Sequence, residues 1–86
     1  MENIEQLCIS LAAEKEHTSQ HTARIARVEL EINQAMERTR TYFGDQIPGQ
    51  EIIRLLTTAL SELARADNAL YALGNEITTY IAELQK

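Results

Sequence analysis

The sequence is poor in the residues that build β-sheets and their turns. Among its 86 residues there are three Gly and one Pro, Val occurs once, and Trp is absent. Strand-rich domains use β-branched and aromatic residues in their strands and many Gly or Pro residues between them. The hydrophobic residues are instead mainly Leu, Ile and Ala, which favour helices. The composition therefore excludes an all-β domain.

Cysteine is almost absent as well. Because Cys8 is the only one, no disulfide can form within the chain, and a domain of this size has little core to stabilise it. No Lys, Arg or His lies near Cys8 in the sequence to lower the pKa of its thiol. We interpret Cys8 as a small packing residue and not as a nucleophile.

Basic residues are also scarce. Eight Lys and Arg oppose thirteen Asp and Glu, and the net charge of −5 disfavours nucleic acid and anionic membrane surfaces as partners. The amino-terminal residues are acidic where a secretory signal carries lysines, and the apolar run 7–13 is too short to span a bilayer. We expect a cytoplasmic protein without membrane insertion, where a lone reduced thiol is ordinary.

Helix-breaking residues gather at one place, between Gly44 and Gly49. Gly44 is typical of a helix end and Pro48 of a helix start. We predict one domain over residues 1–86, with a helix at about 3–43, a turn at 44–49 and a helix at about 50–85. A short link makes the two helices antiparallel, so the fold class is an all-α, coiled-coil-like helical hairpin. The polar segment 14–21 predicts either a weak continuous helix or a kink, and Gly74 predicts a short separate helix after it.

Apolar residues recur in heptads on both predicted helices. In the second helix, Leu56, Leu63, Leu70, Ile77 and Leu84 are seven apart, and Ile52, Ala59, Ala66, Leu73 and Tyr80 lie between them. In the first, the pattern runs through Ile4, Leu7, Leu11, Ile25, Val28, Ile32, Ala35 and Tyr42. We predict that Leu56, Leu63, Leu70 and Leu73 face Ile25, Val28 and Ile32.

The second helix has a further apolar row, formed by Ile53, Leu60 and Ile81, that one neighbouring helix cannot also cover. Either the amino-terminal segment folds back over this row, or a partner chain covers it, as a second copy in a four-helix bundle or as a different protein. We predict a marginal or self-associated protein when it is isolated. The predicted partner-binding residues are Ile53, Leu60, Leu70, Tyr71 and Ile81.

The sequence has no pattern typical of an enzyme. It contains no Gly-rich phosphate loop, no Ser or Cys in a strained elbow and no clustered carboxylate pair on an apolar face, so we expect no catalysis and no cofactor. Glu14, His17 and His21 have a spacing that can bind metal, but the second helix has no His, and we interpret the three as solvated. The arginines of residues 24–40 alternate with glutamates, which favours ion pairs over RNA binding.

Several segments resemble the small E-type co-chaperones of the type III secretion needle. They are Ile4-Glu5-Gln6-Leu7, Gly44-Asp45, Gln50-Glu51 and residues 60–74 (LSELARADNALYALG). The resemblance implies a short cytosolic helical hairpin that joins a larger, helical-repeat G-type chaperone. Together the two proteins would keep the needle subunit monomeric before export. The arm before Gly44 is longer than is usual in that family, and the residues after Gly74 look like an extension.

Other helical hairpins are alternatives. Pro48 and Leu60-Ser61-Glu62 are similar to features of the needle subunits themselves, although residues 83–86 lack the expected apolar and basic terminal residues. Small secreted hairpins of the WXG type have a Trp-x-Gly motif that this sequence lacks. An unrelated dimeric four-helix-bundle adaptor is the third alternative.

Overall fold

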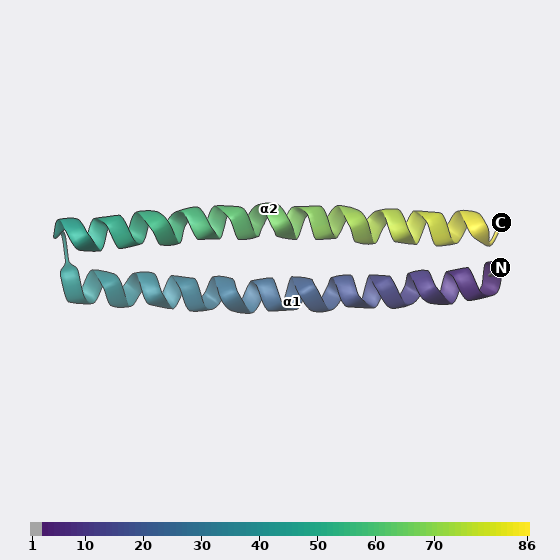
Figure 1. Ribbon diagram of the computed structural model, residues 1–86, viewed down its shortest axis with the longest axis horizontal. Helices are drawn as coiled ribbons and strands as arrows, with labels where there is room; N and C mark the ends of the chain where they lie inside the picture. The colour runs from purple at the N-terminus through teal and green to yellow at the C-terminus, as the bar shows by residue number, and fades with distance from the viewer. Residues whose placement is uncertain (1–2) are drawn as a thin grey trace.

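The protein is a long antiparallel pair of helices. The computed structural model describes residues 3–86, which form α1 (Ile4–Phe43) and α2 (Ile47–Leu84). The helices lie side by side along their whole length, and the start of α1 is at the same end as the finish of α2 (Figure 1). The hairpin measures 61 × 19 × 14 Å. The predicted all-α helical hairpin is confirmed.

Local sequence explains where each helix begins and ends. The Asn3 side chain caps α1 by accepting a hydrogen bond from the Gln6 backbone N–H at 2.8 Å. Gly44 ends α1 with a positive φ of 57°, which glycine adopts without steric cost. Pro48 lies in the first turn of α2, where its missing N–H leaves no helical hydrogen bond unmade. The turn is therefore residues 44–46, shorter than predicted, because Pro48 and Gly49 are already helical.

Neither helix is interrupted at the positions that the sequence marks as weak. Residues 14–21 are a continuous part of α1, and Thr18 is buried there while its hydroxyl donates to the Glu14 carbonyl at 3.0 Å. Gly74 lies within α2, so the predicted short separate helix after it is wrong. A glycine inside a helix costs about 1 kcal/mol, and the burial of Ile77 against α1 close to Gly74 offsets that cost.

The two helices meet along rows of heptad positions a and d, which we call the seam. Except for Ile4 and Lys15, which are exposed, the residues at these positions are buried or half-buried. On α1 the seam contains Cys8, Leu11, Thr18, Thr22, Ile25, Glu29, Ile32, Met36, Thr39 and Phe43. On α2 it contains Gly49, Ile53, Leu56, Leu60, Leu63, Asp67, Leu70, Gly74, Ile77, Ile81 and Leu84.

The seam corrects part of the predicted pairing. Leu56, Leu63 and Leu70 are in the seam with Ile25 and Ile32 opposite, as predicted. Val28 and Leu73 are not, because their side chains are 40% and 49% exposed. The cause lies at the turn, where Phe43 packs so closely on Gly49 that a Cβ added there would lie 2.5 Å from the Phe43 Cβ. This contact turns Met36 and Phe43 inward and the neighbouring Val28 row outward.

The core of the hairpin is thin. Among residues 3–86, Met36 and Ile77 are the buried hydrophobic residues, at 9% and 7% exposure, and no large side chain is fully buried. Thr39 is buried too, and its hydroxyl donates to the Ala35 carbonyl at 2.8 Å. The middle of the seam even holds Asp67, whose Oδ1 is buried without a hydrogen-bond partner. Two helices alone therefore leave much apolar surface in contact with solvent.

Candidate protein-binding surface

The structure places most of the predicted partner-binding residues inside the hairpin. Ile53, Leu60, Leu70 and Ile81 are half-buried in the seam and face α1. The interpretation of Ile53, Leu60 and Ile81 as an uncovered row beside the seam is therefore wrong. Tyr71 is exposed, at 73%, and lies to one side of the seam, where it lines a shallow groove together with Leu70. The five residues do not form one accessible surface.

The uncovered apolar rows are those at heptad position g, one residue before each seam position a. On α2 this row is Ile52, Ala59, Ala66, Leu73 and Tyr80, which the sequence assigned to the seam. On α1 it is apolar mainly near the turn, at Val28, Ala35 and Tyr42, because Glu14 and His21 occupy the same row farther from the turn. The large members of both rows are exposed, from Ile52 at 37% to Tyr42 at 84%. Sequence periodicity found these residues but could not distinguish their row from the adjacent one.

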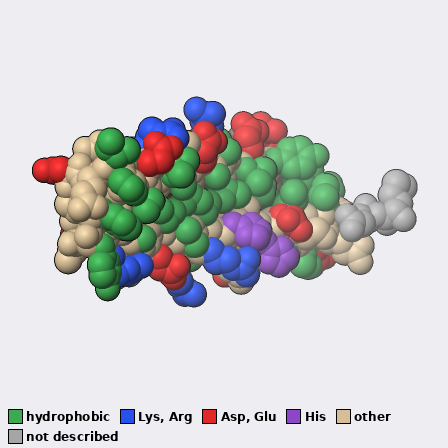
Figure 2. Space-filling model, turned by 60° about the vertical axis from the view of Figure 1, so that its left-hand side comes forward, with side chains coloured by type: hydrophobic (Ala, Val, Ile, Leu, Met, Phe, Trp, Pro, Cys, Tyr) green, Lys and Arg blue, Asp and Glu red, His purple; other side chains and the backbone are tan. Residues whose placement is uncertain are grey.

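Both g rows lie on the same broad side of the molecule. Two antiparallel helices are related by an approximate two-fold axis perpendicular to the plane that contains them, so equivalent heptad rows share one side of that plane. Figure 2 shows the result as a band of hydrophobic side chains along one side, with charged side chains at its borders and the histidines toward one end. We call this surface the apolar face; its residues are Val28, Ala35, Tyr42, Ile52, Ala59, Ala66, Leu73 and Tyr80.

The opposite broad side, formed by the e rows, is different in character. Its side chains are small or uncharged and polar except for Tyr71 and the charged Glu5 and Arg40; the others are Ala12, Ser19, Ala26, Asn33, Gln50, Thr57, Ala64 and Thr78. At the open end of the hairpin a shallow groove of about 630 Å³ lies on this side, lined by residues that include Ile4, Cys8 and Ile81. Of the two broad sides of the hairpin, the one with the apolar face therefore has the longer apolar surface.

The two borders of the apolar face differ in charge. Along α1 the adjacent c row holds His17, Arg24, Glu31 and Arg38, which is net positive even with a neutral histidine. Along α2 the charged residues of the c row are Glu62, Glu76 and Glu83, all negative. The surface thus has an apolar centre, a basic border and an acidic border.

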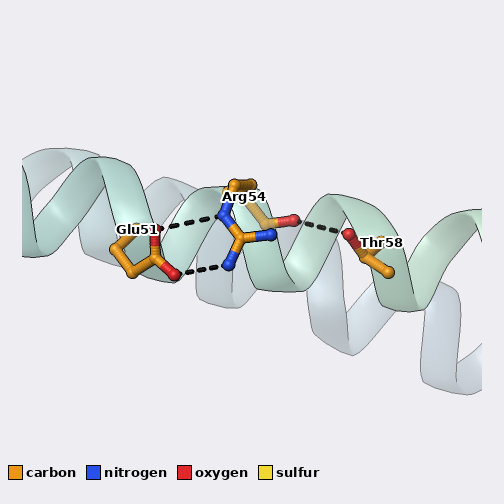
Figure 3. Close-up of polar contacts among 3 residues, drawn as sticks. All are labelled: Glu51, Arg54 and Thr58. Atoms are coloured by element: carbon orange, nitrogen blue, oxygen red, sulfur yellow. Dashed lines mark hydrogen bonds and ion pairs between the residues drawn. The ribbon is translucent and has the colours of Figure 1, made fainter.

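Ion pairs within residues 3–86 are local to one helix. Glu14–His17, Glu51–Arg54 and Glu62–Arg65 are each three residues apart, and none of them involves the arginines of residues 24–40 for which ion pairs were predicted. Figure 3 shows the best-formed pair, in which the Arg54 Nε and Nη2 donate to the two Glu51 carboxylate oxygens at 3.1 and 2.5 Å. The Thr58 hydroxyl donates to the Arg54 carbonyl at 3.0 Å. This exposed pair supports the first turns of α2 and is not a binding site.

The Glu51–Arg54 pair gives a prediction for a pH titration. The hydrogen bonds from Arg54 lower the pKa of the Glu51 carboxyl, and the same contact raises the pKa of Arg54. The pair therefore stabilises α2 above the ordinary glutamate pKa, and this contribution disappears as the pH falls through the lowered value. In a carboxyl NMR titration, we expect Arg54→Ala to raise the pKa of Glu51 and Arg65→Ala to leave it unchanged. An unchanged Glu51 pKa in Arg54→Ala would show that the pair does not form in solution.

Metal-binding sites and membrane-spanning segments each have specific structural requirements. Over residues 3–86 no group of three His, Cys, Asp or Glu side chains is placed to hold a metal ion. In the same part of the chain, neither helix contains a segment long and apolar enough to cross a bilayer. The exposed Glu14 and His17 approach within 3.8 Å, but no third ligand joins them.

Comparison with known proteins identifies no relative, since no protein-family model, no curated protein and no solved structure matches the chain. The class of protein therefore rests on its fold and surface. It is a two-helix, antiparallel coiled-coil hairpin with one uncovered apolar face.

Proposed function

We propose that the protein is a small, non-enzymatic, protein-binding subunit that docks through its apolar face. The observation that carries this proposal is the apolar face itself, which follows α2 and the half of α1 nearest the turn in a hairpin whose core is too thin to be its sole source of stability. Large exposed apolar patches bordered by polar residues are typical of protein interaction sites. In this proposal the docking residues are those of the g rows, whereas partner binding by the five residues that the sequence indicated stays a prediction.

The apolar face has the composition expected for contact with helices. Ile52, Leu73 and Tyr80 are large enough to act as anchors, and a few such anchors usually dominate the energy of an interface. Ala35, Ala59 and Ala66 between them are small and allow a partner helix to approach closely. A partner that offers several helices side by side, such as a helical-repeat protein, has a surface long enough to follow both rows.

The particular function we propose is that of a cytoplasmic co-chaperone of a type III secretion system. It would pair with a helical-repeat G-type chaperone and stabilise the needle subunit before export. The support is the residue resemblance at Gly44-Asp45, Gln50-Glu51 and residues 60–74, combined with a hairpin that keeps one face free for a partner.

Co-purification from the native cytosol, followed by mass spectrometry, tests this function. We expect the wild-type protein to recover a repeat chaperone and a needle-like subunit. Leu73→Asp should lower the affinity for the chaperone at least tenfold, because the complex would enclose an unpaired charge that costs roughly 2 kcal/mol or more. The matched control is Tyr71→Asp on the other broad side, which should bind like the wild type.

Other outcomes would overturn the co-chaperone assignment. Recovery of long polymers of the protein itself would support a needle-like subunit, and its export into the medium would support a secreted hairpin. Equal loss of binding in Leu73→Asp and Tyr71→Asp would show that the apolar face is not the docking surface.

A further inference from the structure

We propose that the apolar face binds, at the open end of the hairpin, a helix of another protein whose apolar residues are flanked by Lys or Arg. The inference rests on the proposed docking function and adds the chemistry of the partner. It concerns the part of the apolar face farthest from the turn, which we call the acidic end. Its residues are Leu73 and Tyr80 with the neighbouring Glu14, Glu76 and Glu83.

Carboxylates lie on both sides of the two apolar anchors of the acidic end. Leu73 and Tyr80 are 49% and 47% exposed and lie one heptad apart on α2. On their outer side, Glu76 and Glu83 are exposed in the adjacent c row. On their inner side, Glu14 occupies the g row of α1, at a level between the two anchors when residues are counted from the contact across the turn.

Little positive charge neutralises these carboxylates. Within residues 3–86, Glu76 and Glu83 take part in no ion pair, and the Glu14 Oε1 lies 3.8 Å from the Nδ1 of the exposed His17, a contact that is ionic only when the histidine is protonated. At the end of the apolar band where the histidines lie, the charged side chains in view are mainly acidic (Figure 2). The two anchors therefore lie in a negative field.

The nearest basic residues lie outside the acidic end. Lys15 lines shallow grooves on the opposite broad side of the hairpin. Arg24 lies nearer the turn than Leu73, and its Nη1 is 3.4 Å from the Nδ1 of His21. Lys86 lies beyond the end of α2. Positive charge is thus what a partner must supply at this end of the apolar face.

A helix is the partner segment that fits this arrangement. Anchors one heptad apart pack against a helix whose own apolar residues repeat with the same spacing. Lys or Arg residues on the two flanks of that apolar stripe would meet Glu14 on one side and Glu76 and Glu83 on the other. A helix with acidic flanks would place like charges together at both borders, which opposes its binding.

Two synthetic peptides test the preference for basic flanks. Each has three heptads with leucine at the two apolar positions, and the positions beside the leucines hold lysine in one peptide and glutamate in the other. Fluorescence anisotropy measures the binding of each peptide to the whole chain at about 0.1 M and about 1 M salt. We expect the lysine peptide to bind at least about tenfold more tightly at the lower salt concentration, and this preference to shrink at the higher one because charges at the rim are screened.

Charge reversal shows where the lysine peptide binds. Glu76→Lys combined with Glu83→Lys should reduce the preference for this peptide at least about fivefold. The matched control combines Glu16→Lys with Glu37→Lys, which change the net charge equally but lie in the b row of α1, outside the apolar face. The control should change the preference less than about twofold, because its charges lie farther from the peptide. Leu73→Asp should weaken binding of the lysine peptide by removing an anchor.

Three results would overturn the inference: equal binding of the two peptides, no binding of the lysine peptide at about 100 μM, or equal effects of the two double variants. The proposed function would survive each of them if Leu73→Asp still loses the chaperone in co-purification. A Leu73→Asp protein that recovers the chaperone like the wild type would instead overturn the docking function itself.

Discussion

Leu60→Asp is expected to unfold the hairpin, and not only to prevent binding. Leu60 is a half-buried seam residue, so the substitution removes apolar contact with α1 and places a carboxylate where no partner is available. Full burial of a leucine is worth about 1.5–3 kcal/mol, of which the half-buried Leu60 loses a part, and the unpaired polar group costs about 1–3 kcal/mol more. The total is comparable to the roughly 3–5 kcal/mol of net stability that a core of this size supplies. Far-ultraviolet circular dichroism should show the loss of helix directly.

The control for Leu60→Asp is the same change at Leu55, a nearby leucine of α2 that lies outside the seam. Leu55 is 54% exposed on the outer border of the apolar face, so its aspartate would be hydrated and the single hairpin should keep its helix content. If Leu60→Asp kept full helicity, Leu60 would belong to an exposed row and α2 would face α1 through a different set of residues.

Alanine substitutions at two glycines of α2 should have effects of opposite sign. At Gly49 the new Cβ would lie 2.5 Å from the Phe43 Cβ, an atom fixed close to the α1 backbone that cannot rotate away. Overpacking of this kind typically costs about 1–3 kcal/mol. At Gly74 no atom lies within 4 Å of the added Cβ, so alanine should stabilise the helix by about 0.5–1 kcal/mol.

Urea unfolding of both variants at the same protein concentration measures this difference. The denaturation midpoint should fall for Gly49→Ala and rise for Gly74→Ala. A rise in both would mean that Phe43 does not pack against Gly49 and that another contact sets the rotation of α1 at the turn.

The amino-acid sequence by itself determined the elements of this fold and their order. Gly44 and Pro48 act locally, one by adopting a positive φ and the other by lacking an N–H, so the break between the helices could be predicted. The heptad row of Leu56, Leu63, Leu70 and Ile77 also depends only on sequence spacing, and it is in the seam as predicted. The helices are set by interactions within a few residues, which periodicity and breaker residues record.

The location of the candidate site was determined only by the tertiary structure. Two rows flank the central row of α2, one with Ile53, Leu60 and Ile81 and one with Ile52, Leu73 and Tyr80, and both have large apolar residues, although the first also contains Asp67 and Gly74. Periodicity cannot choose between them, because they differ by a rotation of the helix about its own axis. The contact of Phe43 with Gly49 across the turn fixes that rotation, and so it buries the first row and leaves the second on the surface.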